Sequence, residues 1–233
     1  MPYYPAFLDL SGRLAVVVGG GQVAARKSAS LLRAGARLRL VAPETHAETR
    51  ALMARGNIEH RARGFIPQDL EGAALVISAT DDEDLNRQVA AEAEKRGILV
   101  NVVDVPELCS FIVPAVVRRG GLLLAISTSG ASPAAARKVR QELEKFFGPA
   151  WAPYLNLMAA VRKRVLAQGR PALENRELFV RLTDSSLLEK VAAADAAGVE
   201  AILREVLGPG YGLADLGLSP DDLIGKVEPG GAE

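Results

Sequence analysis

The sequence has few of the residue types that build disulfide frameworks and metal clusters. Its 233 residues include one cysteine and two histidines. A single cysteine excludes an intrachain disulfide framework and any metal site built from several cysteines. Both histidines, His46 and His60, fall in the first half of the chain, and we expect each to lie on the surface or in a loop. We therefore predict no metal site.

A net charge and long apolar runs are also missing. Lysine and arginine balance aspartate and glutamate at 28 each, so no overall charge attracts nucleic acid. No apolar run approaches the roughly 18 residues of a membrane span. No basic segment followed by an apolar one has the form of a secretion signal. We expect a soluble, cytoplasmic chain that binds neither nucleic acid nor membrane.

The charges are nevertheless unevenly distributed. Between residues 112 and 170, ten lysines and arginines accompany two glutamates, a net charge of +8. From 171 to 233, five basic residues accompany twelve acidic ones, a net charge of −7. Such a basic segment suggests an anionic partner. The alternative, that these charges only keep a helical face solvated, stays open.

The first 114 residues alternate between two patterns. Short apolar, β-branched runs predict strands, and the segments between them have the spacing of helices, three of which end at Gly35, Gly56 and Gly97. Asp82 is placed to cap the third helix. This alternation predicts a parallel sheet with helices on both faces. The expected strands cover 13–20, 37–43, 58–62, 74–80 and 98–104.

The pattern changes after Pro114. Two apolar runs joined at Gly120-Gly121 predict a hairpin, and a helix follows with Ser132 as N-cap and Pro133 at its first position. The rest is mostly helical, with "ENRELFVRL" ambiguous and the last residues, "VEPGGAE", expected to fray. The expected helices cover 153–168, 186–197 and 199–207. We divide the chain into an α/β domain (1–114), a hairpin and helix (115–150) and a helical domain (151–233).

The segment "VVVGGGQVAARK" carries the most recognisable motif. Gly19, Gly21 and Ala24 form Gly-x-Gly-x-x-Ala directly after the first strand and at the start of a helix, the context that the dinucleotide fingerprint requires. Gly19 allows the tight turn, Gly21 lets the backbone approach a pyrophosphate, and Ala24 allows helix and strand to pack closely. The alternative is a glycine turn that binds no nucleotide.

Further nucleotide contacts are expected at the ends of the other strands. Glu44 has the spacing of the acid that binds the ribose, although it follows Pro43 and does not end the strand directly. Thr80 and Asp81, after the fourth strand, are candidates to line the pocket. Arg37 and Arg39 on the second strand could favour NADP, but we favour NAD.

Asp104 ends the fifth strand, in "NVVDVPELCSFIVPA". This position is at the carboxyl edge of the predicted sheet, where the nicotinamide end of a cofactor should reach. A carboxylate there can take or guide a proton while a hydride passes to the cofactor. The alternative is a turn or capping role. Cys109 we expect to be a small packed side chain and not a nucleophile.

Several segments together resemble the precorrin-2 dehydrogenases, which include stand-alone enzymes and the amino-terminal half of multifunctional sirohaem synthases. They are "GGGQVAARK", "VAPE", "ISATDDEDLN", "NVVDVPELCSFIVPA" and "LLLAISTSGASPAAARKVRQELE". The resemblance implies NAD-dependent oxidation of precorrin-2 to sirohydrochlorin by a homodimer, in some members with insertion of Fe²⁺ at the same site. The family's essential aspartate falls on Asp104, and its nucleotide residues fall on Gly21, Gln22, Val23, Pro43 and Glu44.

The resemblance also offers an explanation for the basic segment. The tetrapyrrole substrate carries eight carboxylates, and arginine and lysine pair well with carboxylates. A serine that is phosphorylated in some relatives falls near Thr128, and the helix that Ser132 caps adds N–H groups that suit an anion. The substrate-binding candidates are Arg118, Arg119, Thr128, Ser132, Arg137, Lys138 and Arg140.

Two other functions remain open from the sequence. A non-catalytic NAD-sensing module would use the same glycine motif and dimerise, but it would not need Asp104 or the basic segment. A dehydrogenase of small hydroxy acids is disfavoured, because neither a His/Asp pair nor a catalytic tyrosine motif is visible. Whether iron insertion accompanies the oxidation also stays open, since an iron ion would depend on the macrocycle's own nitrogens.

Overall fold

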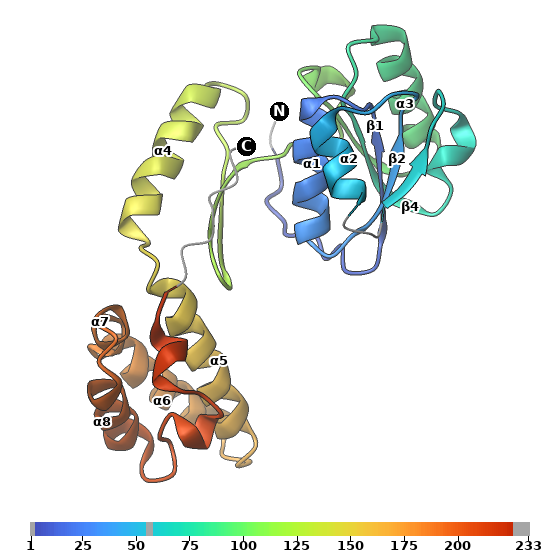
Figure 1. The fold of residues 1–233 in the computed structure, drawn as a ribbon. Helices are drawn as coiled ribbons and strands as arrows, with labels where there is room; N and C mark the ends of the chain where they lie inside the picture. Colours follow the sequence, from blue (N-terminus) through green and yellow to red (C-terminus); the bar gives the residue numbers. More distant parts are fainter. Residues whose placement is uncertain (1–2, 55–57, 226–233) are drawn as a thin grey trace. The chain divides into compact units, whose positions relative to one another are not determined.

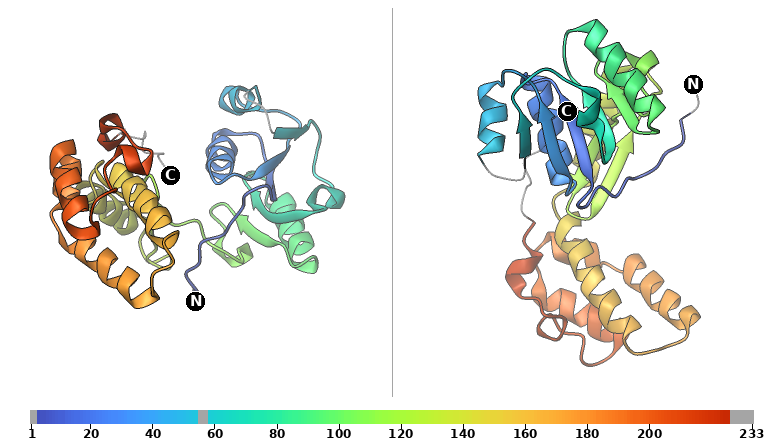
Figure 2. Two further views of the ribbon diagram at one scale, coloured as in Figure 1. Left: turned by 90° about the horizontal axis from the view of Figure 1, so that it is seen from below. Right: turned by 90° about the vertical axis from the view of Figure 1, so that its right-hand side faces the viewer.

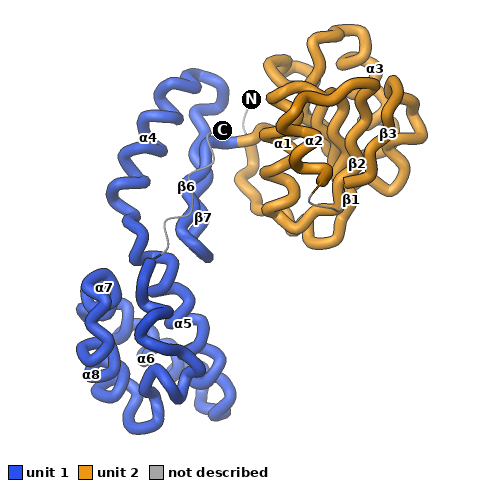
Figure 3. The backbone as a smooth tube through the Cα atoms, viewed as in Figure 1, with its two compact units in different colours: residues 1, 114–233 blue, residues 2–113 orange. Residues whose placement is uncertain are grey.

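The computed structural model describes residues 3–54 and 58–225. The chain falls into two compact units, the amino-terminal unit (Pro2–Val113) and the carboxy-terminal unit (Pro114–Glu233) (Figure 3). The boundary predicted at residue 150 lies inside the second unit, so the division into three domains stays a prediction. The predicted helix end at Gly56 and the predicted fraying of "VEPGGAE" lie outside the described residues. No helix within the described residues is long and apolar enough to cross a membrane.

The amino-terminal unit is built on a parallel sheet of five strands in the order β3-β2-β1-β4-β5. This arrangement confirms the Rossmann-type α/β fold that the sequence predicts. The strands are β1 (Leu14–Val18), β2 (Arg37–Val41), β3 (Ile58–Arg61), β4 (Ala73–Ser78) and β5 (Leu99–Val102). The helices are α1 (Gln22–Arg33), α2 (Ala47–Met53) and α3 (Glu83–Lys95).

Helices cover both faces of this sheet (Figures 1 and 2). Successive side chains of β1 alternate between two apolar clusters. Ala15 and Val17 pack with Leu31 of α1, whereas Val16 and Val18 pack with Val89 of α3. A strand buried on both faces needs a continuous apolar run, and "LAVVV" provides one.

The outer edge of β5 is covered by the chain that follows it. The backbone N–H of Ser110 donates to Val100 O over 2.8 Å, and Ser110 Oγ accepts from Val100 N over 2.8 Å. Further along β5, the N–H of Val102 donates to Cys109 Sγ over 3.2 Å. The residues between, 103–108, therefore form a short loop whose two ends are held together, with a turn of 3₁₀ helix at Pro106–Leu108.

The carboxy-terminal unit begins with an antiparallel hairpin, β6 (Ala115–Arg119) and β7 (Leu122–Ile126). Its two-residue turn is Gly120-Gly121, as predicted, and Gly120 has a positive φ of 56°. Helix α4 (Pro133–Phe146) packs against both strands. Ser132 caps it through a hydrogen bond from Ala135 N to Ser132 Oγ of 3.1 Å, which confirms the predicted N-cap.

Four helices follow around a separate apolar core: α5 (Trp151–Leu166), α6 (Ala172–Asp184), α7 (Leu187–Ala192) and α8 (Ala196–Leu207). The ambiguous "ENRELFVRL" lies within α6. The predicted helix over 186–197 is wrong at its end, because the chain turns at Ala194, whose φ is +50°. Asp195 then caps α8 by accepting from Gly198 N–H over 2.8 Å and pairs with Lys190.

Candidate active site

The candidate site lies at the carboxyl edge of the five-stranded sheet. The chain leaves β1 toward β2 on one side, and β4 adds on the other side of β1. In parallel sheets of this kind ligands bind at such a switch point, beyond the carboxyl ends of the strands. The loops after β1, β2, β4 and β5 all begin at this edge, so they bring together Gly19–Gly21, Pro43 and Glu44, Thr80 and Asp81, and Asp104.

The three glycines after β1 have different surroundings. Gly19 has a φ of +117°, and a Cβ added there would overlap the carbonyl oxygen of Ala79. A Cβ on Gly20 would overlap the carbonyl oxygen of Glu44. A Cβ on Gly21 would meet nothing within 4 Å. The first two glycines therefore let neighbouring loops pack, and the third faces open space.

This open space lies at the N-terminus of α1. Gly21 is the N-cap residue, no side chain caps the helix, and its first turn contains no acidic residue. The first N–H groups of a helix are unpaired within the helix and favour an anion. Ala24 is fully buried against the sheet, as the fingerprint requires. Gly21, Gln22 and Val23 thus fit the diphosphate of a dinucleotide.

The loop after β2 is fixed to the glycine loop. His46 N–H donates to Gly20 O over 2.8 Å, and Thr49 Oγ1 donates to the same oxygen over 3.2 Å. Sequence reasoning missed this role of Gly20, because its partners lie more than twenty residues further along the chain. The side chain of Glu44 is exposed at the carboxyl edge, where it can reach a ribose.

Neither arginine of β2 is placed for a 2′-phosphate. Arg37 begins the strand, at the opposite edge of the sheet from the glycine loop. Arg39 donates to the carboxylate of Glu59 over 2.9 Å and to Asp69 O over 2.8 Å. Its Nε and Nη1 donors are therefore already paired, which agrees with NAD over NADP.

Asp104 occupies the loop after β5, with an exposed side chain and a left-handed backbone (φ +61°). Left-handed conformations are uncommon outside glycine, and aspartate is among the residues that adopt them most readily. The Cys109 thiol spans this loop, since its sulfur lies 3.2 Å from Val102 O and 3.3 Å from Val105 O. Burial raises the pKa of this thiol, so it stays protonated and packs as predicted.

The substrate-binding candidates belong to the carboxy-terminal unit. Thr128 and Ser132 are joined by two hydrogen bonds. Thr128 Oγ1 donates to Ser132 O and accepts from Ser132 N–H, both over 3.1 Å. Arg119 donates to the carbonyl oxygens of Glu144 and Phe147 at the end of α4. Arg140 pairs with Glu144 one turn away.

Three basic candidates remain available for a ligand. Arg118, Arg137 and Lys138 have exposed side chains, and within the described residues none of them forms a hydrogen bond or ion pair through its side chain. Arg118 lies on β6, and the other two lie in the second turn of α4. These three are therefore better candidates for substrate carboxylates than Arg119 and Arg140.

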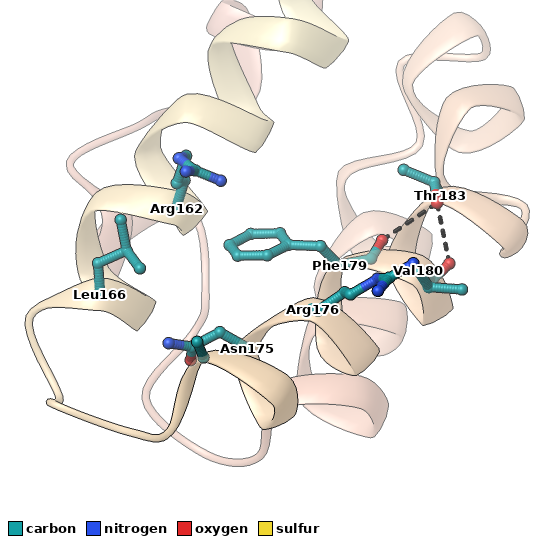
Figure 4. A pocket seen from close by; sticks show the side chains of 8 residues that line it. Arg162, Leu166, Asn175, Arg176, Phe179, Val180 and Thr183 are labelled. Carbon is teal, nitrogen blue, oxygen red and sulfur yellow. Dashed lines mark hydrogen bonds between the residues drawn. The ribbon is translucent and has the colours of Figure 1, made fainter.

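A pocket of about 440 Å³ between α5 and α6 contains none of these candidates (Figure 4). Arg162 lies over the ring of Phe179 there, 5.6 Å from its centroid. Asn175 is buried at its base, and its side-chain N–H donates to Arg170 O over 3.2 Å. Among the described residues, no three histidine, cysteine or acidic side chains gather in a way that could hold a metal ion.

Comparison with known proteins accounts for both units. Residues 6–115 match a family described as putative NAD(P)-binding, and residues 119–145 match the central region of sirohaem biosynthesis proteins. A siroheme synthase of Pseudomonas paraeruginosa is 44% identical over 211 residues, and one of Stutzerimonas stutzeri is 39% identical over 225 residues. The chain is thus similar to the sirohaem synthases along nearly its whole length. This similarity confirms the resemblance found in the sequence.

The chain spans about half the length of these sirohaem synthases. The aligned part covers 90% of this chain but 45% of the Pseudomonas protein, and 97% of this chain but 48% of the Stutzerimonas protein. A solved structure titled "SirC, precorrin-2 dehydrogenase" matches nearly end to end, with a TM-score of 0.75 and 26% identity over 88% of this chain and 98% of that one. The likeness to the family thus extends through both units.

Proposed function

We propose that this chain oxidises precorrin-2 to sirohydrochlorin with NAD⁺ as the hydride acceptor. The observation that carries the proposal is the position of Asp104. Its loop follows β5 at the same edge of the sheet as the open N-terminus of α1 beside Gly21. A diphosphate group and a free carboxylate thus have places along one edge, in a chain that is similar to the sirohaem synthases.

The reaction removes one hydride and one proton from the macrocycle. NAD⁺ bound at this edge supplies an acceptor for the hydride. Gly21 leaves room for the diphosphate, and the N–H groups of Gln22 and Val23 stabilise its charge. Glu44 accepts hydrogen bonds from a ribose, and Thr80 and Asp81 border the same edge.

Asp104 acts on the proton. Its carboxylate is exposed, so it can accept a proton from the macrocycle and release that proton to water. The loop that carries Asp104 is held at both ends by contacts with Ser110 and Cys109, and such positioning lowers the entropic cost of the transfer. The exposed Arg118, Arg137 and Lys138 bind carboxylates of the macrocycle.

The same proposal includes a homodimer. It is supported by the apolar side chains of Val139 and Phe146, which are exposed on α4. Sedimentation velocity would test it.

The test is NADH formation by the purified protein supplied with precorrin-2 and NAD⁺. Wild-type protein is expected to form NADH, and Asp104→Asn to reduce turnover by roughly 10²–10⁴-fold, the usual contribution of a general acid or base. The affinity for NAD⁺, measured by calorimetry, is expected to stay within about twofold, because Asp104 lies beyond the diphosphate site.

The same assay separates the alternatives. Wild-type protein that binds NAD⁺ but forms no NADH would support the NAD-sensing module instead. An Asp104→Asn variant with normal turnover would leave the oxidation in place but remove Asp104 from it. Loss of NAD⁺ binding in that variant would give the residue a structural role.

A further inference from the structure

A buried asparagine lies directly behind the nucleotide edge. Asn86, on α3, is 4% exposed, and Ser78, at the end of β4, is fully buried. A buried amide is costly unless its N–H and carbonyl groups find hydrogen-bond partners. Asn86 finds both: its Oδ1 accepts from Ser78 Oγ over 2.7 Å, and its Nδ2 donates to Thr80 O over 3.0 Å.

These two bonds fix the loop between β4 and α3. The loop is held at Ser78, where β4 ends, and at Thr80, two residues into the connection. Thr80 Oγ1 in turn accepts from the N–H of Asp82, the residue that caps α3 by accepting from Leu85 N–H. The loop thus follows one path from the sheet into the helix.

The position of this loop constrains the glycine loop after β1, because the two are in contact. Ala79 N–H donates to Val18 O over 2.8 Å, and Ala79 O lies where a Cβ on Gly19 would be. A shift of the Ala79–Thr80 segment would therefore move either Gly19 or the entrance to the diphosphate site. Ser78 also accepts through its backbone oxygen from Val103 N–H, beside Asp104.

We propose that Asn86 is a positioning residue of the nucleotide site: it holds the Ala79–Thr80 segment against the glycine loop and so sets the affinity for NAD⁺. The proposal rests on the proposed function, since it assumes that this edge binds NAD⁺. Asn86 itself is buried behind the loop. It acts only through its hydrogen bonds to Ser78 and Thr80.

Asn86→Asp tests the proposal with a side chain of nearly the same shape. The variant keeps an acceptor for Ser78 Oγ but presents an oxygen, and not an N–H group, to Thr80 O. The two acceptors repel each other, so Thr80 moves. The dissociation constant for NAD⁺, measured by calorimetry, is expected to rise about tenfold, the low end of what lost outer-shell hydrogen bonds cost at metal sites. Ser78→Ala leaves the hydrogen bond from Asn86 to Thr80 in place, so it is expected to raise the dissociation constant for NAD⁺ by less.

Asn175→Asp is the matched control. Asn175 is also a buried asparagine on a helix, and its Nδ2 also donates to a backbone oxygen, but it lies in the carboxy-terminal unit. It is expected to lower the melting temperature without changing the affinity for NAD⁺. Equal losses of affinity in both variants, or an unchanged affinity in Asn86→Asp, would overturn the proposal.

Amide hydrogen exchange keeps the inference apart from the proposed function. In Asn86→Asp the amides of Ala79 and Asp82 are expected to exchange faster than in the wild type, with no nucleotide present. If wild-type protein failed to bind NAD⁺, the proposed function would be wrong, and unchanged exchange at these amides would overturn the positioning role separately. Should Asn86→Asp not fold, Ser78→Ala gives both measurements.

Discussion

The three glycines after β1 show how one short motif serves both folding and binding. Gly19 and Gly20 are needed because neighbouring carbonyl oxygens occupy the space of their side chains. Gly21 has no such neighbour, and its φ of −76° is open to any residue. The fold alone therefore gives no reason for glycine at position 21, whereas a diphosphate at the helix N-terminus does.

Gly21→Val is expected to separate these two roles. The valine should block the diphosphate and raise the dissociation constant for NAD⁺ more than about tenfold, a loss above about 1.4 kcal/mol. Stability should change by no more than about 0.5 kcal/mol, as for an ordinary surface substitution. Calorimetry with NAD⁺ and urea unfolding measure the two quantities.

Gly148→Val is the control for this substitution. Gly148 also lacks a positive φ and has open space at its Cβ, but it belongs to the carboxy-terminal unit. Its replacement should leave the affinity for NAD⁺ unchanged. An unaltered affinity in Gly21→Val as well would remove the nucleotide from the glycine motif.

At the scale of elements, the connection between β3 and β4 depends on one buried carboxylate. Asp69, in the 3₁₀ turn Pro67–Leu70, is 2% exposed and accepts from both terminal nitrogens of Arg63, over 2.7 and 2.8 Å, and from Ile66 N–H over 2.9 Å. Burial alone would raise the pKa of this carboxyl, but the hydrogen bonds from Arg63 and Ile66 outweigh it and hold the pKa below the usual 3.8.

This lowered pKa makes Asp69 a source of stability that depends on pH. A carboxyl with a lower pKa in the folded state stabilises the fold fully above its unfolded value and loses that contribution as the pH falls through the folded value. Asp69→Asn should therefore cost about 2 kcal/mol at pH 7, the scale of hydrogen bonds to a charged group. The difference from the wild type should shrink below about pH 4.

Urea unfolding of both proteins between pH 3 and pH 7 measures this dependence. Asp84→Asn is the matched control, because Asp84 pairs with Arg87 at the surface, with 93% of its side chain exposed. That variant should lose no more than about 0.5 kcal/mol at any pH. A constant difference between Asp69→Asn and the wild type across this range would contradict the assignment.

The elements themselves were largely predictable from the sequence, and their ends and contacts were less so. The strands of the parallel sheet follow from short apolar runs, and α1 and α3 follow from helical spacing with glycine after each end. The break between α7 and α8 was predicted at residue 198 but lies at 193–195, because Asp195 caps α8 and takes Gly198 into its first turn. Gly20, Asn86 and Cys109 were missed as supports of the site, since their partners are set by the folded chain and not by local spacing.

At the scale of the whole molecule, chemistry is divided between two compact units. The amino-terminal unit carries the nucleotide edge and Asp104, and the carboxy-terminal unit carries the exposed basic side chains of β6 and α4. The chain is neutral overall, so the net charge of +8 between residues 112 and 170 is a local feature that the total conceals. This local charge is what an anionic macrocycle would encounter.

Binding of sirohydrochlorin is therefore expected to weaken as salt rises. Exposed charges are screened over about 8 Å at physiological ionic strength. Arg118→Ala and Arg137→Ala should each cost about 1 kcal/mol or less of binding free energy, because both side chains are exposed. Fluorescence titration across a salt series measures both effects.

Arg181→Ala is the control for the basic segment. Arg181 is also exposed but lies on α6, in the acidic part of the sequence. Its loss should leave the affinity for sirohydrochlorin unchanged. A flat response to salt, or equal losses in all three variants, would assign the basic segment to solubility.

The covered outer edge of β5 links chemistry to aggregation. A bare edge strand offers unpaired N–H and C=O groups to any other extended chain. Here the segment that covers that edge is Cys109–Phe111, which directly follows the loop that carries Asp104. A substitution that loosens the loop to admit a bulkier macrocycle would also uncover the strand. Substitutions in this loop that are meant to broaden the substrate range should therefore make the protein insoluble before they abolish catalysis.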